Sequence, residues 1–184
     1  DIAQLECAAS VWTVMSAYAE ACGFPDCTLT MARQSSAIQS TRFMTSLPDE
    51  FRDNYCQNGL ILDDPFLTLI CQNMSVTAIA TDPSRFPETN QKQGAFLDLT
   101  RSLGVKSAIC IPVKTNAQPE FGGWVIGGAE DGAQFKRRFA KSGMRLQMAG
   151  LIANERIQAL SYQKCRPTSP LSPRERECLL WLSA

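Results

Sequence analysis

A tyrosine and an aspartate nine residues apart, Tyr55 and Asp64, carry the groups needed to hold a secondary amide by its two polar ends. A phenol donates a hydrogen bond to a carbonyl oxygen, and a carboxylate accepts one from an amide N–H. Phe51 lies four positions before Tyr55, so the two rings would share one face of a helix. Phe66 and Leu67 follow Asp64 and would complete an apolar wall. This stretch therefore predicts a small-molecule pocket.

The same residues also fit a structural role. Asp64 precedes Pro65, and an aspartate before a proline at the first helical position is a typical helix N-cap. Tyr55 would then be a core aromatic residue whose hydroxyl reaches water. On residue types alone the structural role is the stronger of the two, and both stay open at this point.

A second candidate segment, residues 95–113, joins a helix to a strand. Phe96, Leu97 and Thr100 are spaced to share one helical face. Gly104 would permit a tight turn from the helix into the strand. By itself this pattern is typical of an amphipathic helix that packs on a sheet.

A third segment is the tail, where "LSPREREC" is followed by the apolar run "LLWL". Ser172 is a candidate N-cap, Pro173 would occupy the first helical position, and Glu175 would complete a capping box. The tail therefore predicts the start of a helix directly after a linker rich in proline and serine.

The elements that position these segments follow from hydrophobic periodicity and from turn residues. The helices cluster between antiparallel strands instead of alternating with them, which predicts an α+β fold: an α-β-α sandwich around a five-stranded antiparallel sheet. Ligand-sensing domains of the PAS and GAF type share this architecture. The predicted helices are 2–22, 48–58, one from Asp64 onward, 93–104 and 134–163, and the predicted strands are 27–33, 42–47, 75–81, 107–114 and 122–130.

Composition excludes several classes of function. The chain has 18 basic and 18 acidic residues, so it has no positive field for phosphate-driven DNA binding. It has no histidine, which removes His-ligated zinc, Ser-His-Asp triads and Cys-His nucleophiles. Its eight cysteines are irregularly spaced and are interpreted as buried, reduced thiols. We expect no metal, no enzymatic activity, no membrane-spanning segment and a cytoplasmic location.

The tail motif resembles the opening of the C-terminal helix-turn-helix DNA-binding domain of LuxR-type transcription regulators. The residues before it resemble the autoinducer-binding domain of the same quorum-sensing family. The matches are Tyr55, Asp64 with Pro65, and "LGVKSAICIPV", which is similar to the family's FG-x-R-S-G-x-T-x-P segment. The resemblance implies a ligand-binding domain over 1–163, a linker over 164–170 and the truncated start of the DNA-binding domain over 171–184.

The family binds N-acyl-homoserine lactones, and the resemblance carries its site residues over. A tyrosine hydroxyl bonds the acyl carbonyl and an aspartate accepts the amide N–H, so Tyr55 and Asp64 receive these roles and the pocket becomes the favoured interpretation. The resemblance further implies a homodimer, a small-molecule signal without any cofactor, and DNA contact through the C-terminal domain. Further pocket positions carry over to Phe66, Leu67, Phe96, Leu97, Thr100 and Val105.

Three positions depart from the family pattern. Phe51 stands where the family usually has a tryptophan whose indole N–H bonds the lactone carbonyl. Ile79 lies near a second common pocket tryptophan, and Ala108 replaces a glycine. A buried carbonyl left without a donor costs about 1–3 kcal/mol, or roughly ten- to a hundredfold in affinity. Either another donor serves, such as Trp12 or Trp124, or the ligand's head group is not a lactone.

Three functions compete on this basis. The first is a ligand-responsive LuxR-type regulator in which binding controls folding and dimerisation. The second is an orphan sensor for a non-lactone ligand, or a ligand-independent regulator with an occluded pocket. The third is an interaction module that dimerises with a related regulator. The long helix after Gln134 is a candidate dimer surface, with sheet packing as the alternative, through Phe135, Phe139, Leu146, Leu151 and Ile152.

Overall fold

The computed structural model describes residues 2–34, 38–81, 90–114 and 120–164, together with the single positions 172, 174 and 181. Residues 82–89 and 115–119, which were expected to be loops, lie outside this description. So do the predicted linker, apart from residue 164, and the tail helix, apart from three isolated positions.

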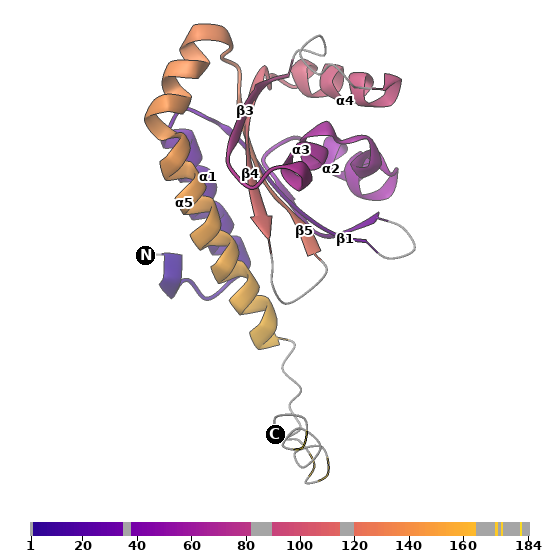
Figure 1. Cartoon of the computed structure of the whole chain (residues 1–184), viewed down its shortest axis with the longest axis vertical. Helices are drawn as coiled ribbons and strands as arrows, with labels where there is room; N and C mark the ends of the chain where they lie inside the picture. Colours follow the sequence, from indigo (N-terminus) through magenta and orange to yellow (C-terminus); the bar gives the residue numbers. More distant parts are fainter. Residues whose placement is uncertain are drawn as a thin grey trace.

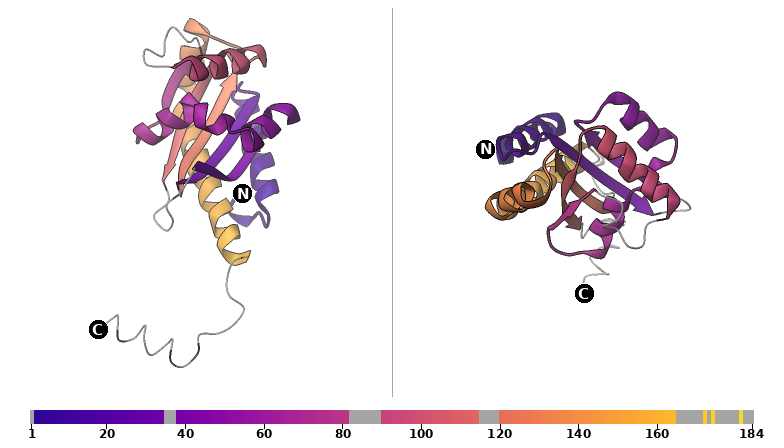
Figure 2. Two further views of the ribbon diagram at one scale, coloured as in Figure 1. Left: turned by 90° about the vertical axis from the view of Figure 1, so that its right-hand side faces the viewer. Right: turned by 90° about the horizontal axis from the view of Figure 1, so that it is seen from above.

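One five-stranded antiparallel sheet, in the order β2-β1-β5-β4-β3, forms the centre of the molecule. Helices α1 and α5 lie side by side on one face of the sheet, and α2, α3 and α4 cover the other face (Figures 1 and 2). The predicted α-β-α sandwich is therefore confirmed. The strands are β1 Asp26–Gln34, β2 Ile38–Thr45, β3 Thr77–Ala80, β4 Ser107–Lys114 and β5 Glu120–Gly128; the helices are η1 Ile2–Gln4, α1 Ala8–Ala21, α2 Asp49–Gln57, η2 Leu60–Asp63, α3 Pro65–Gln72, α4 Gln91–Ser102 and α5 Gly132–Lys164.

The first predicted helix divides into two elements. A short 3-10 turn, η1, precedes α1, and Cys7 caps α1 because its Sγ accepts a hydrogen bond from the Ser10 backbone N–H at 3.4 Å. The six cysteines within the described residues are thiols, but only Cys27 and Cys110 are buried, whereas Cys7, Cys56 and Cys71 are exposed. The expectation of uniformly buried thiols is therefore corrected.

The larger core fills the layer between the sheet and α1 with α5. Trp124 of β5 is fully buried there and stacks on Trp12 of α1, with ring centroids 5.9 Å apart. Its indole N–H donates to the Gly150 carbonyl of α5 at 2.9 Å. A Cβ at Gly150 would lie 3.1 Å from the indole ring, so the glycine lets α5 approach the sheet closely.

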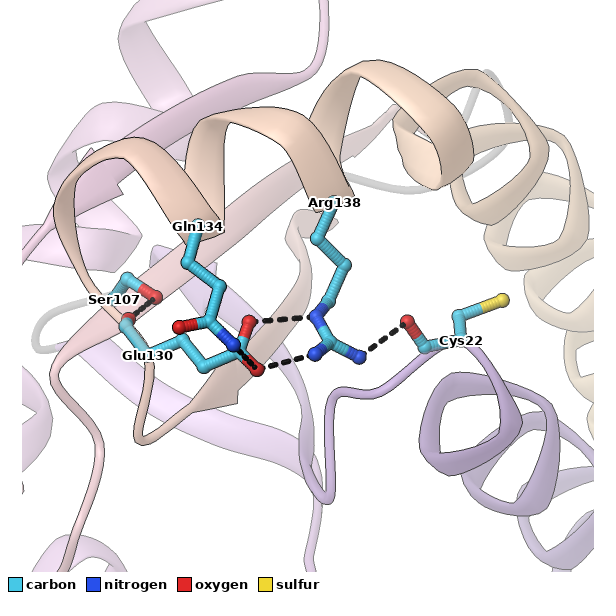
Figure 3. Close-up of polar contacts among 5 residues, drawn as sticks. All are labelled: Cys22, Ser107, Glu130, Gln134 and Arg138. Carbon is cyan, nitrogen blue, oxygen red and sulfur yellow. Dashed lines mark hydrogen bonds and ion pairs between the residues drawn. The ribbon is translucent and has the colours of Figure 1, made fainter.

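Arg138 joins the beginning of α5 to the end of α1 (Figure 3). Its guanidinium forms an ion pair with Glu130, in which Nε donates to Oε2 at 2.7 Å, and its Nη1 donates to the Cys22 carbonyl at 3.5 Å. Gln134 also donates to the Glu130 carboxylate at 2.8 Å, and the Ser107 hydroxyl donates to the Glu130 backbone carbonyl at 2.6 Å. The network ties α1, β4 and α5 together at one corner of the sheet.

The residues of α5 that were predicted for a dimer surface lie on different faces of the helix. Phe135 and Leu146 are buried in the larger core and Phe139 packs against it, so these residues hold α5 to the sheet. Leu151 and Ile152 are exposed, by 38% and 46%. Sheet packing thus holds for one face of α5, and the dimer surface stays a prediction for the exposed face. No helix among the described residues is both long and apolar enough to cross a bilayer.

Candidate functional site: a cavity between the sheet and helices α2–α4

A second core, between the sheet and helices α2, α3 and α4, contains a cavity of about 30 Å³. Strands β1 and β5 contribute residues to one side of this cavity, and helices α2, α3 and α4 contribute residues to the other (Figure 1). Its wall is mostly apolar with a few polar side chains, as is usual for ligand sites. The lining residues are Asp26, Thr28, Leu47, Phe51, Tyr55, Asp64, Phe66, Phe96, Thr100, Val105, Val125 and Gly127.

Asp64 is both a helix cap and a member of this wall. Its Oδ1 accepts hydrogen bonds from the backbone N–H groups of Phe66 and Leu67, at 2.8 and 3.2 Å, which caps α3. Its Oδ2 accepts a hydrogen bond from the Tyr55 hydroxyl at 2.7 Å. The structural role inferred from the residue types is therefore present, and the same carboxylate also borders the cavity.

Burial dominates the electrostatics of this pair. Loss of solvent raises the pKa of the Asp64 carboxyl to about 6, although the hydrogen bonds from Tyr55, Leu67 and Phe66 oppose the shift. The pKa of Tyr55 lies well above its ordinary value because of burial and the nearby Asp64 charge. Asp64 therefore changes protonation close to neutral pH, whereas Tyr55 stays a hydrogen-bond donor.

The pair retains capacity for a ligand. An ionised carboxylate has about four lone-pair positions, and three are used by Phe66, Leu67 and Tyr55. One position can accept an amide N–H. The Tyr55 hydroxyl also contacts the Thr30 side chain. This contact can remain when the hydroxyl proton turns from Asp64 toward a ligand carbonyl.

Aromatic rings occupy most of the layer around the cavity. Phe43 stacks on Tyr55 with ring centroids 4.2 Å apart, and Phe51 lies 5.9 Å from Tyr55 and 6.1 Å from Phe96. Phe66 completes the cluster, 6.0 Å from Phe96. Sites for drug-sized ligands measure roughly 300–1,000 Å³, so a ligand with an acyl chain must move some of these rings aside.

The structure gathers the predicted site residues into one layer. Phe51, Tyr55, Asp64, Phe66, Phe96, Thr100 and Val105 line the cavity. The other four predicted positions belong to the same core without lining the cavity: Leu67, Leu97 and Ala108 are buried in it, and Ile79 packs against it.

Neither suggested indole donor lies in this layer. Trp12 and Trp124 are both part of the core on the opposite face of the sheet, and the Trp124 N–H is already bonded to Gly150. Among the described residues that line the cavity, no side chain carries an N–H donor that could replace the missing indole at Phe51.

Comparison with known proteins now identifies the domain. A family model described as an autoinducer binding domain matches residues 8–157, which is most of the chain. The chain belongs to the autoinducer-binding-domain family. A comparison with curated protein sequences gave no significant match.

Solved structures support the fold of this autoinducer-binding domain. It is similar to CepR2 from Burkholderia cenocepacia, an N-acylhomoserine-lactone-dependent LuxR-family transcription factor, with 16% identity, a TM-score of 0.70 and coverage of 86% of this chain and 90% of that one. It is also similar to Escherichia coli SdiA, with 13% identity, a TM-score of 0.70 and coverage of 99% and 74%. SdiA in complex with octanoyl-rac-glycerol gives 15% identity, a TM-score of 0.61 and coverage of 99% and 72%. At these identities the likeness concerns the fold.

Five residues of the cavity wall were not predicted: Asp26, Thr28, Leu47, Val125 and Gly127. A signal for two of them was present, because "DCTLTMA" alternates polar and apolar residues. In the autoinducer-binding domain Cys27, Leu29 and Met31 of β1 pack under α1 and α5, and Asp26 and Thr28 face α2–α4. The polar residues of the strand therefore face the cavity. Alternation alone cannot distinguish such a face from one that is exposed to solvent.

Proposed function

We propose that this domain binds an acylated amide, with N-acyl-homoserine lactones as the reference class, and that binding controls the folding and dimerisation of a LuxR-type regulator. The observation that carries the proposal is the buried Asp64 carboxylate in the cavity wall, bonded to Tyr55 and still able to accept one more hydrogen bond. The ligand amide N–H would donate to Asp64, and the Tyr55 hydroxyl would turn its one proton from Asp64 to the acyl carbonyl.

The energetic argument rests on the cost of burying a charge. The raised pKa of Asp64 means that the folded domain destabilises its ionised form. A ligand N–H adds a charge-assisted hydrogen bond to that form, and the acyl chain adds apolar contact with Phe51, Phe66 and Phe96. Because the folded state alone offers this site, ligand stabilises it by mass action.

Dimerisation would use the exposed apolar face of α1 and α5. Val14 and Tyr18 of α1 and Met144, Met148 and Ile152 of α5 line an open groove of about 550 Å³ together with their neighbours. Met144 and Met148 are 68% and 55% exposed, which is unusual for apolar side chains gathered on one surface. We propose a second copy of the chain as the occupant, because α5 ends at Lys164, directly before the proposed linker, so a dimer here would hold two following domains together.

The remaining assignments follow the same proposal. The ligand-binding domain would span 1–163 and the linker 164–170, and residues 171–184 would begin a helix-turn-helix domain that contacts DNA. The DNA contact would belong to that domain, since the chain has no net positive charge.

A thermal-shift experiment tests the ligand proposal. The melting temperature of the full chain would be measured with acyl-homoserine lactones of four to twelve acyl carbons. A ligand at about 100 times its Kd adds about 2.7 kcal/mol, which raises the Tm of a domain of this size by about 5–11 °C. We expect Asp64→Asn to reduce the shift strongly and Tyr55→Phe to reduce it partly.

The control variant is Asp98→Asn, which makes the same substitution on the exposed side of α4. It should leave the shift unchanged. A shift that persists in Asp64→Asn contradicts the amide clamp, and the absence of a shift with every lactone contradicts the proposed ligand class.

A second candidate is an orphan sensor for a non-lactone amphiphile, favoured by the small cavity and by Phe51 at the position of the family's indole donor. Octanoyl-rac-glycerol, which is bound to SdiA in one similar structure, provides the discriminating probe. An acylglycerol has neither an amide N–H nor a lactone ring, although its hydroxyl groups can donate hydrogen bonds to the carboxylate of Asp64. A shift with octanoylglycerol, without any lactone response, would favour the orphan sensor.

A further inference from the structure

The cavity has polar groups beyond the Tyr55–Asp64 pair. Asp26 and Thr28, two residues apart at the start of β1, both line it. Since side chains two apart on a strand point to the same face, both extend toward helices α2–α4. Gly127 pairs with Asp26 on β5, and a Cβ at Gly127 would lie 3.6 Å from the Cβ of Asp26 and 2.6 Å from Val105. Gly127 therefore lets the Val105 side chain pack closely against β5 beside Asp26.

Asp26 is an acceptor without a donor in the described residues. Its carboxylate makes no hydrogen bond or ion pair with them, although it is half-buried. Burial raises its pKa, the response of a carboxylate that has lost water without gaining a compensating donor. A ligand donor would provide that compensation.

The neighbouring hydroxyls add acceptors instead of N–H donors. Thr100 donates its proton to the Leu97 carbonyl at 2.8 Å, which leaves its oxygen lone pairs toward the layer. Thr28 shares a hydrogen bond of 2.8 Å with Thr45, and either hydroxyl can be the donor. This end of the cavity therefore complements a group that donates hydrogen bonds, and it disfavours a bare carbonyl or methyl terminus.

The two polar regions are separated along the strand. Tyr55 contacts Thr30, so the Tyr55–Asp64 pair lies over the Thr30 row of β1. Asp26 lies four residues before Thr30, or about 13 Å along an extended strand. Phe51, Phe96 and Val125 line the cavity with them and provide apolar surface. An extended chain advances about 1.2 Å per bond, so about eight to ten bonds, together with a hydrogen bond of about 2.8 Å at the far end, cover this span.

We propose that Asp26 and Thr28 form a second polar subsite, which binds a hydroxyl or ammonium group at the end of the ligand remote from its amide. The proposal rests on the proposed function, because it takes the amide position at Tyr55 and Asp64 from it. The ligand class is then a bipolar acyl amide: an amide at one end, an apolar spacer of about eight to ten bonds, and a hydrogen-bond donor at the other end.

Three matched probes test the subsite by isothermal titration calorimetry with the full chain. They are N-octanoyl-homoserine lactone and its 8-hydroxyoctanoyl and 8-aminooctanoyl analogues, which differ only at the chain terminus. We expect the hydroxyl and ammonium probes to bind about five- to tenfold more tightly than the methyl-terminated one. A 4-hydroxybutanoyl analogue should gain nothing over its butanoyl parent, because its hydroxyl does not reach Asp26.

Variants at Asp26 distinguish the subsite from a general solvent effect. Asp26→Ala should remove both advantages, so that the three probes bind with about equal affinity. Asp26→Asn should keep the hydroxyl advantage, because its amide oxygen still accepts, and should lose the ammonium advantage with the charge. Asp98→Asn removes one negative charge outside the cavity and should change none of the ratios.

The subsite alone would be overturned by tighter binding of the methyl-terminated probe in the wild type, or by unchanged affinity ratios in Asp26→Ala. A complete lack of binding by every probe would overturn the proposed function, and with it this inference. Binding of the octanoyl lactone without any benefit from a polar terminus would leave the proposed function standing and refute only the subsite.

Discussion

At the scale of single residues, Asp64 has the capping role that its residue type predicted, and it also borders the cavity. It caps α3 through the Phe66 and Leu67 amides and accepts the Tyr55 hydroxyl at the cavity wall. The residue types and their order predicted the cap, and the family resemblance added the pocket role, which stays a prediction. They could not predict the Tyr55–Asp64 hydrogen bond, because that contact depends on how α2 and α3 pack, and they gave no reason to select Asp26.

The raised pKa of Asp64 gives a pH prediction. The pKa is about 6 in the folded chain and 3.8 in the reference state, so between these values the folded chain binds more protons than the unfolded one. This contribution is fully present below about pH 4 and is lost as the pH rises through about 6. We expect wild-type stability relative to Asp64→Asn to increase by about 1–3 kcal/mol from pH 7.5 to pH 4.5.

Urea denaturation of the two proteins across this range provides the measurement. Asparagine also caps helices well, so Asp64→Asn should fold and serve as the reference in which all other titrating groups are retained. Parallel stability curves for the two proteins would show that Asp64 has an ordinary pKa in the folded state.

At the scale of elements, the sequence predicted each strand and most helices, because periods of two and of three to four residues follow the burial of one face. It did not predict which face of β1 would receive its polar residues, nor that α5 would bury Phe135 and Leu146 while exposing Leu151 and Ile152. Those assignments depend on which layer each face meets, and this is a property of the assembled sheet.

Gly23 permits a prediction about the turn that follows α1. Gly23, which ends α1, has φ +87°, and a Cβ there would lie 1.4 Å from Nη1 of Arg138. Gly23→Ala should therefore destabilise the chain by about 1–3 kcal/mol, since it strains the backbone and displaces the guanidinium from Cys22.

Gly94, inside α4, is the matched control. A Cβ there would meet no atom within 4 Å. Gly94→Ala should stabilise the chain by about 0.5–1 kcal/mol, because alanine favours the helix. Chemical denaturation of both variants tests the pair, and equal effects of the two substitutions would contradict the role assigned to the turn at Gly23.

At the scale of the whole molecule, the sheet separates two cores with different tasks. The α1/α5 layer is closely packed around Trp124, whereas the α2–α4 layer holds the cavity and its buried carboxylate. Sequence patterns predicted the three-layer architecture. The cavity volume and the placement of both described core tryptophans away from it follow from side-chain packing, which no local pattern encodes.

The exposed groove on α1 and α5 gives a prediction about which substitutions weaken the proposed dimer. Met148→Glu places a charge at the centre of the proposed dimer surface, on a side chain that is 55% exposed. Sedimentation velocity should show a shift from dimer to monomer, with the stability of the monomer changed by less than about 0.5 kcal/mol.

Met74→Glu is the control for that substitution. Met74 is 74% exposed but lies before β3, outside the groove. Its charge should leave the dimer intact. A wild-type chain that is monomeric at all concentrations, or equal effects of the two charges, would contradict the proposed surface.

The stack of Trp12 on Trp124 has a spectroscopic consequence. The two indoles are nearly parallel, 12° apart, and they lie across the sheet from the cavity, while Trp181 is largely exposed. A molecule that enters the cavity touches neither of the two stacked indoles, so direct quenching would be absent. Any change in their emission or in their near-ultraviolet circular dichroism would report a displacement that has passed through the sheet to the α1/α5 face. Tryptophan emission and near-ultraviolet circular dichroism would therefore test whether binding in the cavity changes the α1/α5 face.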